Sequence, residues 1–290
     1  MGEINPSPLL YEQMRSFVEL ARTLNLSEAV RNLGSTRQTV RRHIAYLEEA
    51  RGESLFEVRD RRYRLTEVGR NAFREAEELI ARGKAWLVNA SGHENGLFYL
   101  CAEHVEGFTY YLQQQPLGMM WKSKSGLLPF GMQCWAEARG EIEAEAFARI
   151  RPWLMIFRKL EDDWVCVEVG DKSSFATWYG WKRKSSSVGR GIATLPGGTG
   201  FANLLSQPFH ETRMTEGVRL DHIHTRIPDA ENTELVPMSY ERLLMNCYFP
   251  DGSNAIAALI NRTWDISIRG MPEGTAQTMP REKLMDFEPP

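Results

Sequence analysis

Apolar side chains recur at helical spacing through the first part of the chain. Between Leu10 and Leu24 they fall every three or four positions, which predicts a helix with one buried face. After a break, Ser27 to Leu33 shows the same spacing, and Ser27 is a suitable N-cap for a short second helix. Gly34 favours the end of that helix, because glycine adopts the left-handed conformation at low cost.

A third helix is predicted after that turn. Thr36 is a natural N-cap, and an apolar stripe at Val40, Ile44 and Leu47 marks the buried face. Two short helices around a glycine turn form a helix-turn-helix, whose second helix enters the major groove of DNA. The polar side chains that point largely away from the stripe are those of Arg37, Gln38, Arg41 and Arg42.

A ribbon and a long helix are predicted next. Leu55–Val58 and Arg64–Thr66 are typical of two short strands around a charged tip, a β-wing. Thr66 then caps a helix of about twenty residues whose apolar stripe reaches Leu87. This length exceeds what one small winged domain needs, so the stripe requires a partner, and a second copy of the chain is the simplest one. The arginines of the wing tip are Arg59, Arg61 and Arg62.

Directly after residue 92, apolar residues show no regular helical or strand spacing. A polar, glycine-rich break at 91–96 predicts a domain boundary. We expect a strand near Leu97–Cys101, irregular structure after it, and a helix from about Met132 to Ile150. Residues 93–150 are therefore interpreted as an aromatic-rich connecting segment.

Antiparallel strands are predicted beyond residue 150. The apolar runs at 154–158 and 164–169 are too close for a parallel crossover, which needs a dozen or more residues, so they form a hairpin. Residues 219–227 alternate strictly between apolar and polar, as a half-exposed strand does. The remaining expected elements are strands at 243–249 and 255–264, a helix over about 201–215 and a loose, proline-rich tail at 271–290.

Length and composition limit the class of protein. The 290 residues predict two domains, and 42% hydrophobic with 25% charged residues is typical of a globular protein rather than a disordered one. No apolar run approaches the ~18 residues that cross a bilayer, and no secretory signal is present, so we expect a cytoplasmic protein without a membrane partner. The four cysteines form no Cys-x-x-Cys pair and are expected to be small buried hydrophobes.

Positive charge is concentrated near the N-terminus. Residues 31–70 hold ten arginines and no lysine against six acidic residues, although the whole chain has a net charge of −3. Attraction to phosphate needs only one positive face, so this window is compatible with nucleic-acid binding. The alternative is a solvated helix face balanced by glutamates.

Four short motifs follow one another in this window. In this order and spacing they resemble the winged helix-turn-helix of LysR-type transcriptional regulators, over about the first 90 residues. The motifs are Ser27-x-Ala29-x-x-x-Leu33, Thr36-x-x-x-Val40-x-Arg42-x-Ile44-x-x-Leu47-Glu48, Gly52-x-x-Leu55-Phe56-Glu57 and Arg64-Leu65-Thr66-x-x-Gly69.

The resemblance implies a dimer or tetramer that binds partly palindromic promoter DNA and pairs through the helix at 67–87. Arg42 occupies the family's recurrent arginine position, which implies contact with phosphate or bases. Gln38 and Arg41 stand where the family often has proline and serine, so we expect a different half-site. Arginine to guanine and glutamine to adenine are the commonest major-groove pairs. An ion pair of Arg41 or Arg42 with Glu48 or Glu49 is the alternative.

Residues 151–270 resemble a PAS-type sensor domain in the order of their elements. The order is a hairpin, short helices, one longer helix and three antiparallel strands, with Trp178-Tyr179-Gly180 and Val188-Gly189-Arg190 at the positions of an aromatic-glycine and a following glycine. Such a domain holds a small molecule between sheet and helices or mediates dimerisation. The candidate ligand-binding residues are Trp164, Trp178, Trp181 and His210, of which the last has the position of a haem ligand in some sensors.

Other candidate chemistry is sparse. His222 and His224 share one strand face but have no evident third metal ligand, so hydrogen-bonded or surface histidines are the preferred interpretation. The run 196–201 leads into a helix yet lacks the Gly-Lys-Ser/Thr of a phosphate-binding loop. No catalytic arrangement, metal site or cofactor motif is identified, and the chain is not expected to be an enzyme.

The combined interpretation is an α+β multidomain protein. It has a winged helix-turn-helix at 1–66, a dimerisation helix at 67–92, the connecting segment, and a sensor or interaction domain at 151–270 with an antiparallel, PAS-like sheet. The predicted function is a DNA-binding transcriptional regulator. Two alternatives stay open: a periplasmic-binding-like effector domain with a mostly parallel sheet, and an enzyme fused to a DNA-binding module.

Overall fold

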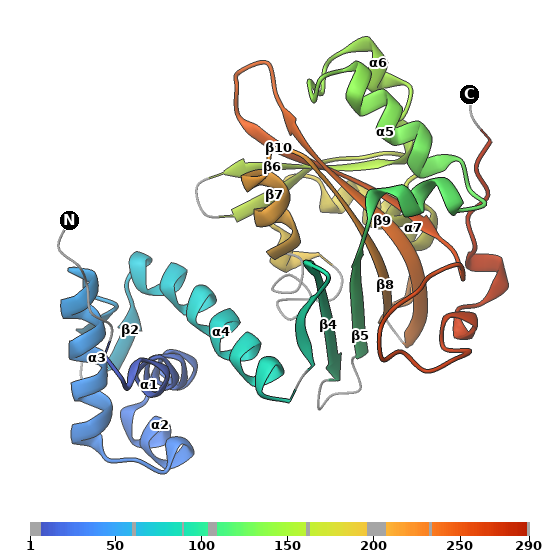
Figure 1. Cartoon of the computed structure of the whole chain (residues 1–290). Helices are drawn as coiled ribbons and strands as arrows, with labels where there is room; N and C mark the ends of the chain where they lie inside the picture. Colours follow the sequence, from blue (N-terminus) through green and yellow to red (C-terminus); the bar gives the residue numbers. More distant parts are fainter. Residues whose placement is uncertain are drawn as a thin grey trace. The chain divides into compact units, whose positions relative to one another are not determined.

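The chain divides into two compact units, residues 1–88 and 89–290, in a computed structural model (Figure 1). The structure describes residues 7–59, 62–88, 90–103, 109–160, 163–195, 207–231 and 234–288. The first unit is a helix-turn-helix with a wing. The second is a mixed α/β unit built on an antiparallel sheet.

The first unit contains four helices and a two-stranded ribbon among its described residues. Asn25, rather than the expected Ser27, is the N-cap of the second helix, and its side chain accepts hydrogen bonds from the amides of Ser27 and Glu28. Gly34 ends that helix at φ 60°, as predicted. The elements are α1 (Leu10–Thr23), α2 (Leu26–Leu33), α3 (Arg37–Arg51), β1 (Phe56–Arg59), β2 (Arg62–Leu65) and α4 (Glu67–Leu87).

The long helix α4 is part of the core of this unit. Its residues Ala72, Ala76 and Ile80 are buried in the same apolar cluster as Phe17 of α1 and Val40 of α3. The expected boundary between a domain at 1–66 and a separate helix at 67–92 is therefore wrong. The three-helix core is too small to close on its own, and the first half of the α4 stripe covers it.

The junction between wing and α4 depends on the predicted cap. The hydroxyl of Thr66 accepts a hydrogen bond from the amide of Gly69 at 2.9 Å and donates one to the carbonyl of Ser54 at 2.7 Å. A Cβ atom at Gly69 would lie 2.0 Å from the carbonyl oxygen of Leu55. Only glycine allows this approach of helix and wing, which explains its place in the motif.

The second unit is organised around one eight-stranded sheet of order β3-β4-β5-β8-β9-β10-β6-β7. Every pairing between these strands is antiparallel, so the predicted antiparallel hairpins are confirmed and the mostly parallel sheet of the periplasmic-binding-like alternative is not observed among the described strands. The strands are β3 (Ser91–Glu94), β4 (Leu97–Glu103), β5 (Thr109–Gln115), β6 (Leu154–Leu160), β7 (Asp163–Val169), β8 (Val218–Pro228), β9 (Leu235–Tyr248) and β10 (Asn254–Arg262).

Residues 93–150 are an integral part of this unit and not a connecting segment. Strand β5 pairs with β8, with Leu112 opposite Ile223, and so extends the sheet by three strands. The expected helix at 132–150 is two helices, because Arg139 and Gly140 have φ of 52° and 78° and end the first. The helices here are the 3-10 helix η1 (Leu117–Lys122), α5 (Leu127–Glu137) and α6 (Glu145–Ala148).

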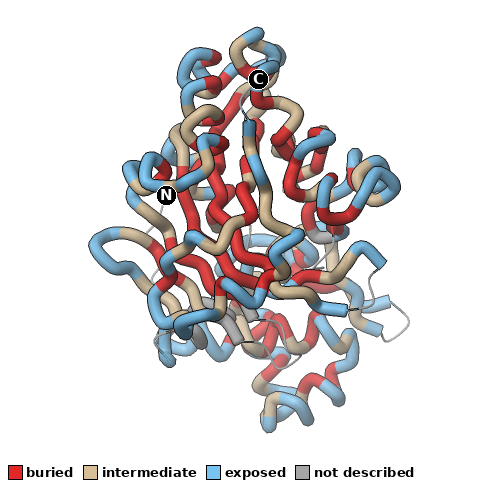
Figure 2. The backbone as a smooth tube through the Cα atoms, turned by 90° about the vertical axis from the view of Figure 1, so that its right-hand side faces the viewer, coloured by how far each residue is buried: buried red, intermediate tan, exposed pale blue. Residues whose placement is uncertain are grey.

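Both faces of the sheet are covered. Helices α5 and α6 pack on one face through a cluster that includes Leu128, Leu243 and Leu259. On the other face lie α7 (Ser174–Ser187) and a helix over 207–214. Figure 2 shows buried residues along the central strands. Strand β8 was expected to be half-exposed, but its polar residues other than Arg226 are buried along with most of its apolar ones, because layers lie on either side.

The C-terminal segment packs against the sheet, so the expectation of a loose tail at 271–290 is wrong for the described residues. Met279 is 1% exposed in the apolar cluster of the α7 face, and Phe287 lies edge-on to Trp153 with ring centroids 5.3 Å apart. Prolines prevent regular hydrogen bonding here, but the apolar side chains between them still bury surface. The remaining short 3-10 helices are η2 (Arg151–Trp153), η3 (Ile192–Thr194), η4 (Ala276–Thr278) and η5 (Arg281–Lys283).

Candidate functional sites

One face of α3 presents polar side chains to solvent. The helix begins after Thr36, whose hydroxyl accepts a hydrogen bond from the amide of Thr39 at 3.1 Å. Val40, Ile44 and Leu47 are buried on the opposite face, as the apolar stripe predicted. The exposed side chains are those of Thr36, Arg37, Gln38, Arg41 and Arg42, and we call them the α3 surface.

The charges of the α3 surface are not neutralised by the described part of the chain. Arg41 and Arg42 make no ion pair with a described residue, and Arg37 donates to the neutral hydroxyl of Ser27 at 2.8 Å. Glu48, an alternative partner, accepts hydrogen bonds from the amides of Leu55 at 2.7 Å and Phe56 at 3.1 Å. Its carboxylate is therefore engaged in holding the wing.

The side of α3 that faces the core carries a hydrogen-bonded histidine. His43 Nδ1 lies 2.7 Å from the hydroxyl of Ser16 on α1. Burial lowers the pKa of His43, and the nearby charge of Arg42 lowers it further. The imidazole therefore anchors the helix as a neutral hydrogen-bonding group, while the positive charge stays on the outer side.

The wing carries less free charge than its sequence suggests. Arg59 is exposed but pairs with Glu57, with Nη2 and Oε2 2.9 Å apart. Arg62 lies opposite Arg59 in the ribbon and is exposed. Arg61 lies outside the described residues. Of the three predicted wing arginines, Arg62 therefore offers the clearest unpaired guanidinium in the described part of the wing.

The distal part of α4 exposes apolar side chains. Leu79 is 52% exposed and Trp86 is 71% exposed, and Leu87 and Val88 are similarly open. These four residues form what we call the α4 patch. Large apolar side chains exposed at the end of a helix commonly mark a site of interaction with a partner.

A small cavity lies between the α7 face of the sheet and the helices that cover it. Its volume is about 90 Å³. The walls come from strands β6, β9 and β10 and from α7, with Arg242 as the single charged side chain among the described lining residues. These are Met155, Phe157, Ser174, Phe175, Trp178, Tyr179, Leu195, Phe209, Ile227, Met238, Tyr240, Arg242, Ala258 and Ile260.

The four predicted ligand-binding residues are placed differently from one another. Trp178 lines the cavity. Trp164 is buried but does not line the cavity, and its ring lies edge-on to that of the lining residue Phe209. Trp181 is 73% exposed, and His210 is exposed on the helix at 207–214, so neither lines the cavity.

A break in α7 separates the two tryptophans of that helix. Gly180 has φ 78° and ψ 175°, a conformation open essentially to glycine alone. In an unbroken helix Trp178 and Trp181 would share a face, because residues three apart are neighbours. The break turns Trp178 inward and leaves Trp181 in solvent, which the sequence periodicity did not reveal.

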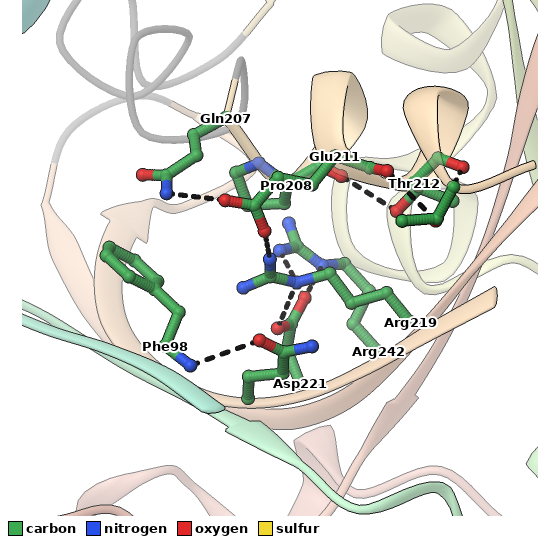
Figure 3. A network of polar contacts seen from close by, with 10 residues as sticks. Phe98, Gln207, Pro208, Glu211, Thr212, Arg219, Asp221 and Arg242 are labelled. Carbon is green, nitrogen blue, oxygen red and sulfur yellow. Dashed lines mark hydrogen bonds and ion pairs between the residues drawn. The ribbon is translucent and has the colours of Figure 1, made fainter. Parts of the chain in front are cut away.

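A buried ion network, drawn in Figure 3, shares Arg242 with the wall of the cavity. The carboxylate of Asp221 accepts from Arg219 Nε at 2.7 Å and from Arg242 Nη2 at 2.7 Å, and Arg219 also contacts Glu211 on the helix at 207–214. Burial alone would raise the pKa of Asp221, but the two guanidinium groups outweigh it and lower the pKa. Asp221 is therefore ionised and holds both arginines.

Sequence reasoning missed this network. Its signal is present in retrospect: Arg219 and Asp221 alternate with apolar residues on β8, and Arg242 stands directly before the apolar run 243–245 on β9. Charged side chains in a central strand must be paired when both faces are covered. The sequence did not show that both faces are covered.

The paired histidines of β8 are structural. His222 Nδ1 accepts from the amide of Ser267 at 2.9 Å, and His224 Nδ1 lies 2.8 Å from the hydroxyl of Ser239. Both are buried rather than on the surface, and the described residues contain no group of three potential metal ligands. The glycine-rich run at 196–201 lies outside the described residues.

A helix-turn-helix with an exposed basic second helix and a two-stranded wing defines the first unit as a DNA-binding domain. Comparison with known families agrees. Residues 11–70 match the family described as bacterial regulatory helix-turn-helix protein, lysR family. The chain thus carries a LysR-type helix-turn-helix domain at its N-terminal end.

Several solved structures share a limited part of the chain. The oxidised form of OxyR from Corynebacterium glutamicum is 22% identical over 31% of this chain and 28% of that one, with a TM-score of 0.28. A full-length OxyR variant from Pseudomonas aeruginosa is 26% identical over 28% of each chain, with a TM-score of 0.26. The complex of the BenM DNA-binding domain with catB site 1 DNA is 25% identical over 29% of this chain and 98% of that one, with a TM-score of 0.27.

Each of these three structures covers less than a third of this chain. The chain spans less than a third of the length of the OxyR structures it matches. No curated protein matches it. Among the described helices, none combines the length and apolar character needed to cross a bilayer.

Proposed function

We propose that this protein is a sequence-specific transcriptional regulator that inserts α3 into the major groove of promoter DNA. The observation that carries the proposal is the α3 surface, where three arginines and Gln38 are exposed and the described chain offers no counter-ion to Arg41 or Arg42. Arginine pairs bidentately with guanine and glutamine with adenine, each worth about 1–3 kcal/mol of discrimination. The α3 surface has the groups for both.

The wing adds contacts to the backbone of the DNA. Arg62 is exposed, and Arg59 can exchange its exposed partner Glu57 for a phosphate at little cost, since surface ion pairs contribute about 0–1 kcal/mol. The proposed contacts of Arg59, Arg61 and Arg62 are sequence-independent. They position the recognition helix on the duplex.

Two copies of the chain pair through the α4 patch in this proposal. Leu79, Trp86, Leu87 and Val88 are apolar and exposed at the end of a helix whose other face is already buried. A second copy supplies the same surface and closes the contact by two-fold symmetry. Paired recognition helices then fit a partly palindromic site.

The second unit regulates DNA binding as a sensor domain. A PAS-like arrangement is supported by the element order: the β6–β7 hairpin, α7, the helix at 207–214, then β8, β9 and β10, with β10 beside β6. A cavity between sheet and helices offers room for a small molecule. The localisation that fits a regulator of this kind is the cytoplasm.

The test is a binding titration with the full chain. A target duplex is first recovered by selection from genomic fragments of the source organism. Arg42→Ala and Arg41→Ala should each raise the Kd by about 5- to 150-fold, the equivalent of 1–3 kcal/mol, by fluorescence anisotropy at about 0.15 M salt. Arg281→Ala, an exposed arginine of the second unit, is the control. Unchanged affinity in both α3 variants would refute the proposal.

A further inference from the structure

The cavity beside α7 has the composition of a site for an apolar ligand with one polar end. Its walls include six aromatic rings and several aliphatic side chains, and Arg242 is the single charged group among the described lining residues. Aromatic walls favour a ring that packs edge-on or offset against them. Ligand sites commonly combine such walls with a few polar groups that fix orientation.

Arg242 has donor capacity that the protein does not use. The side chain is 2% exposed, and its Nε and Nη2 donate to Asp221 at 3.3 and 2.7 Å. Its Nη1 atom is buried and has no hydrogen bond of normal geometry to a described residue, although the Tyr110 hydroxyl lies beside the guanidinium group. Buried donors are nearly always satisfied in folded proteins, so one left open beside a cavity calls for an acceptor from outside the chain.

The charge balance of the network favours an anionic acceptor. Two guanidinium groups, Arg219 and Arg242, share the single fully buried carboxylate of Asp221. The second carboxylate, Glu211, contacts Arg219 only from the helix at 207–214, and its side chain is 37% exposed. The four groups balance in total, but Arg242 pairs only with Asp221, which it shares with Arg219, and burial strengthens the attraction of its guanidinium group for a further anion.

The volume limits the size of the ligand. The cavity holds about 90 Å³, which is smaller than the ~150 Å³ cavity of an engineered protein that binds benzene. A single ring or a short branched chain is therefore the largest body that enters with modest adjustment of side chains. Phe209 and Leu195, on the side of the covering segments, are the wall residues best placed to adjust.

From these observations we infer that the cavity binds a small apolar monocarboxylate, with the ring or branched chain against the aromatic walls and the carboxylate at Arg242. The inference rests on the proposed regulatory role of the second unit. Such a ligand contacts β9 through Arg242 and the helix at 207–214 through Phe209. Its occupancy is therefore sensed by the Arg219–Glu211 contact, which joins that helix to the sheet.

The experiment uses the full chain with phenylacetate as the probe and toluene as a matched compound without the carboxylate. Phenylacetate should raise Tm in a concentration-dependent way, because a ligand of the folded state stabilises it, and should change tryptophan fluorescence through Trp178. Toluene should bind at least about tenfold more weakly, because it offers no acceptor to the guanidinium group.

Two variants locate the site. Ala258→Leu fills the cavity without touching the ion network and should abolish the effect of phenylacetate. Trp181→Ala removes an exposed tryptophan of α7 outside the cavity and should leave the effect unchanged. Circular dichroism and DNA binding without ligand verify that Ala258→Leu is folded.

Three outcomes would overturn the inference: no stabilisation by phenylacetate, stabilisation that persists in Ala258→Leu, or equal binding of toluene. Each leaves the proposed function untouched, because DNA binding through the α3 surface is measured without any ligand. Conversely, loss of the α3 effect would not alter the phenylacetate titration.

Discussion

At the scale of single residues, a few side chains with unusual surroundings determine the local structure. Glu48 holds both amides at the start of the wing, and Gly69 lets α4 approach the carbonyl of Leu55. Gly180 breaks α7 and decides which tryptophan faces the cavity. In each case the residue type is visible in the sequence, but its role is set by a hydrogen bond, a close approach or a backbone conformation that only the structure shows.

The contact at Gly69 yields a stability prediction. Gly69→Ala places a Cβ atom 2.0 Å from the Leu55 oxygen, and because both sides are backbone the wing must move. We expect a loss of about 3 kcal/mol in the free energy of unfolding, measured by urea denaturation of the full chain. Gly83→Ala in the same helix meets only the Tyr11 ring at 3.3 Å and should be neutral or stabilising. Equal effects of the two substitutions would contradict this explanation.

At the scale of elements, α4 has two roles along its length. Its first half completes the core of the DNA-binding unit through Ala72, Ala76 and Ile80, and its second half exposes the α4 patch. Deleting the helix would therefore unfold the unit as well as remove the patch. Point substitutions in the patch separate the two roles.

Substitutions that introduce a negative charge into the α4 patch test whether the chain dimerises through it. Leu79→Glu and Trp86→Glu should convert a dimer into a monomer at micromolar concentration, because a buried carboxylate without a partner opposes association. Light scattering gives the mass, and Glu75→Ala, an exposed position of the same helix, is the control. A wild-type monomer, or variants that remain dimeric, would refute pairing through this surface.

At the scale of the whole molecule, the two units differ in how their sequences encode them. The first is built from local elements with their own caps, although its core joins residues as far apart as Phe17 and Ile80. The second joins strands from residues 91 to 262 into one sheet covered on both faces. Because both faces of the sheet are covered, polar side chains of the central strands lie in the interior. There, charged groups must be ion-paired and other polar groups must be neutral.

One consequence is a pH-dependent stability of the second unit. Burial, and then the charge of Arg226, lowers the pKa of His224 from 6.5 to about 4. A lowered pKa means that the unfolded chain binds the proton first, so the stabilisation is complete above pH 6.5 and is lost as pH falls toward 4. We expect a loss of about 2 kcal/mol between about pH 7.5 and about pH 5 from this group.

Urea unfolding followed by tryptophan fluorescence measures this loss, since seven of the eight tryptophans lie after residue 88. His224→Gln should flatten the dependence, whereas His210→Gln, at an exposed position, should not. An unaltered pH profile in His224→Gln would show that another group is responsible. The lowered pKa of Asp221 acts below this window, because its unfolded value is 3.8.

Local sequence signals are sufficient to predict the helices and wing of the first unit and the hairpins of the second. Helix periodicity, the Thr36 and Thr66 caps, the glycine turn and the short loop between two apolar runs are all local signals, and local interactions decide those elements. The residues of the α3 surface were identified in the same way, because exposure on a helix follows from the position of its buried stripe.

The other features depend on contacts between distant parts of the chain. The pairing of β5 with β8, the helices over both faces of the sheet, the place of α4 in the first core and the packing of the C-terminal segment join residues far apart in sequence. The local spacing of apolar residues carries no information about such contacts. The cavity and its guanidinium group arise from the same cause, because burial of Arg242 and Asp221 follows from the layers that cover them and not from the residues on either side in the chain.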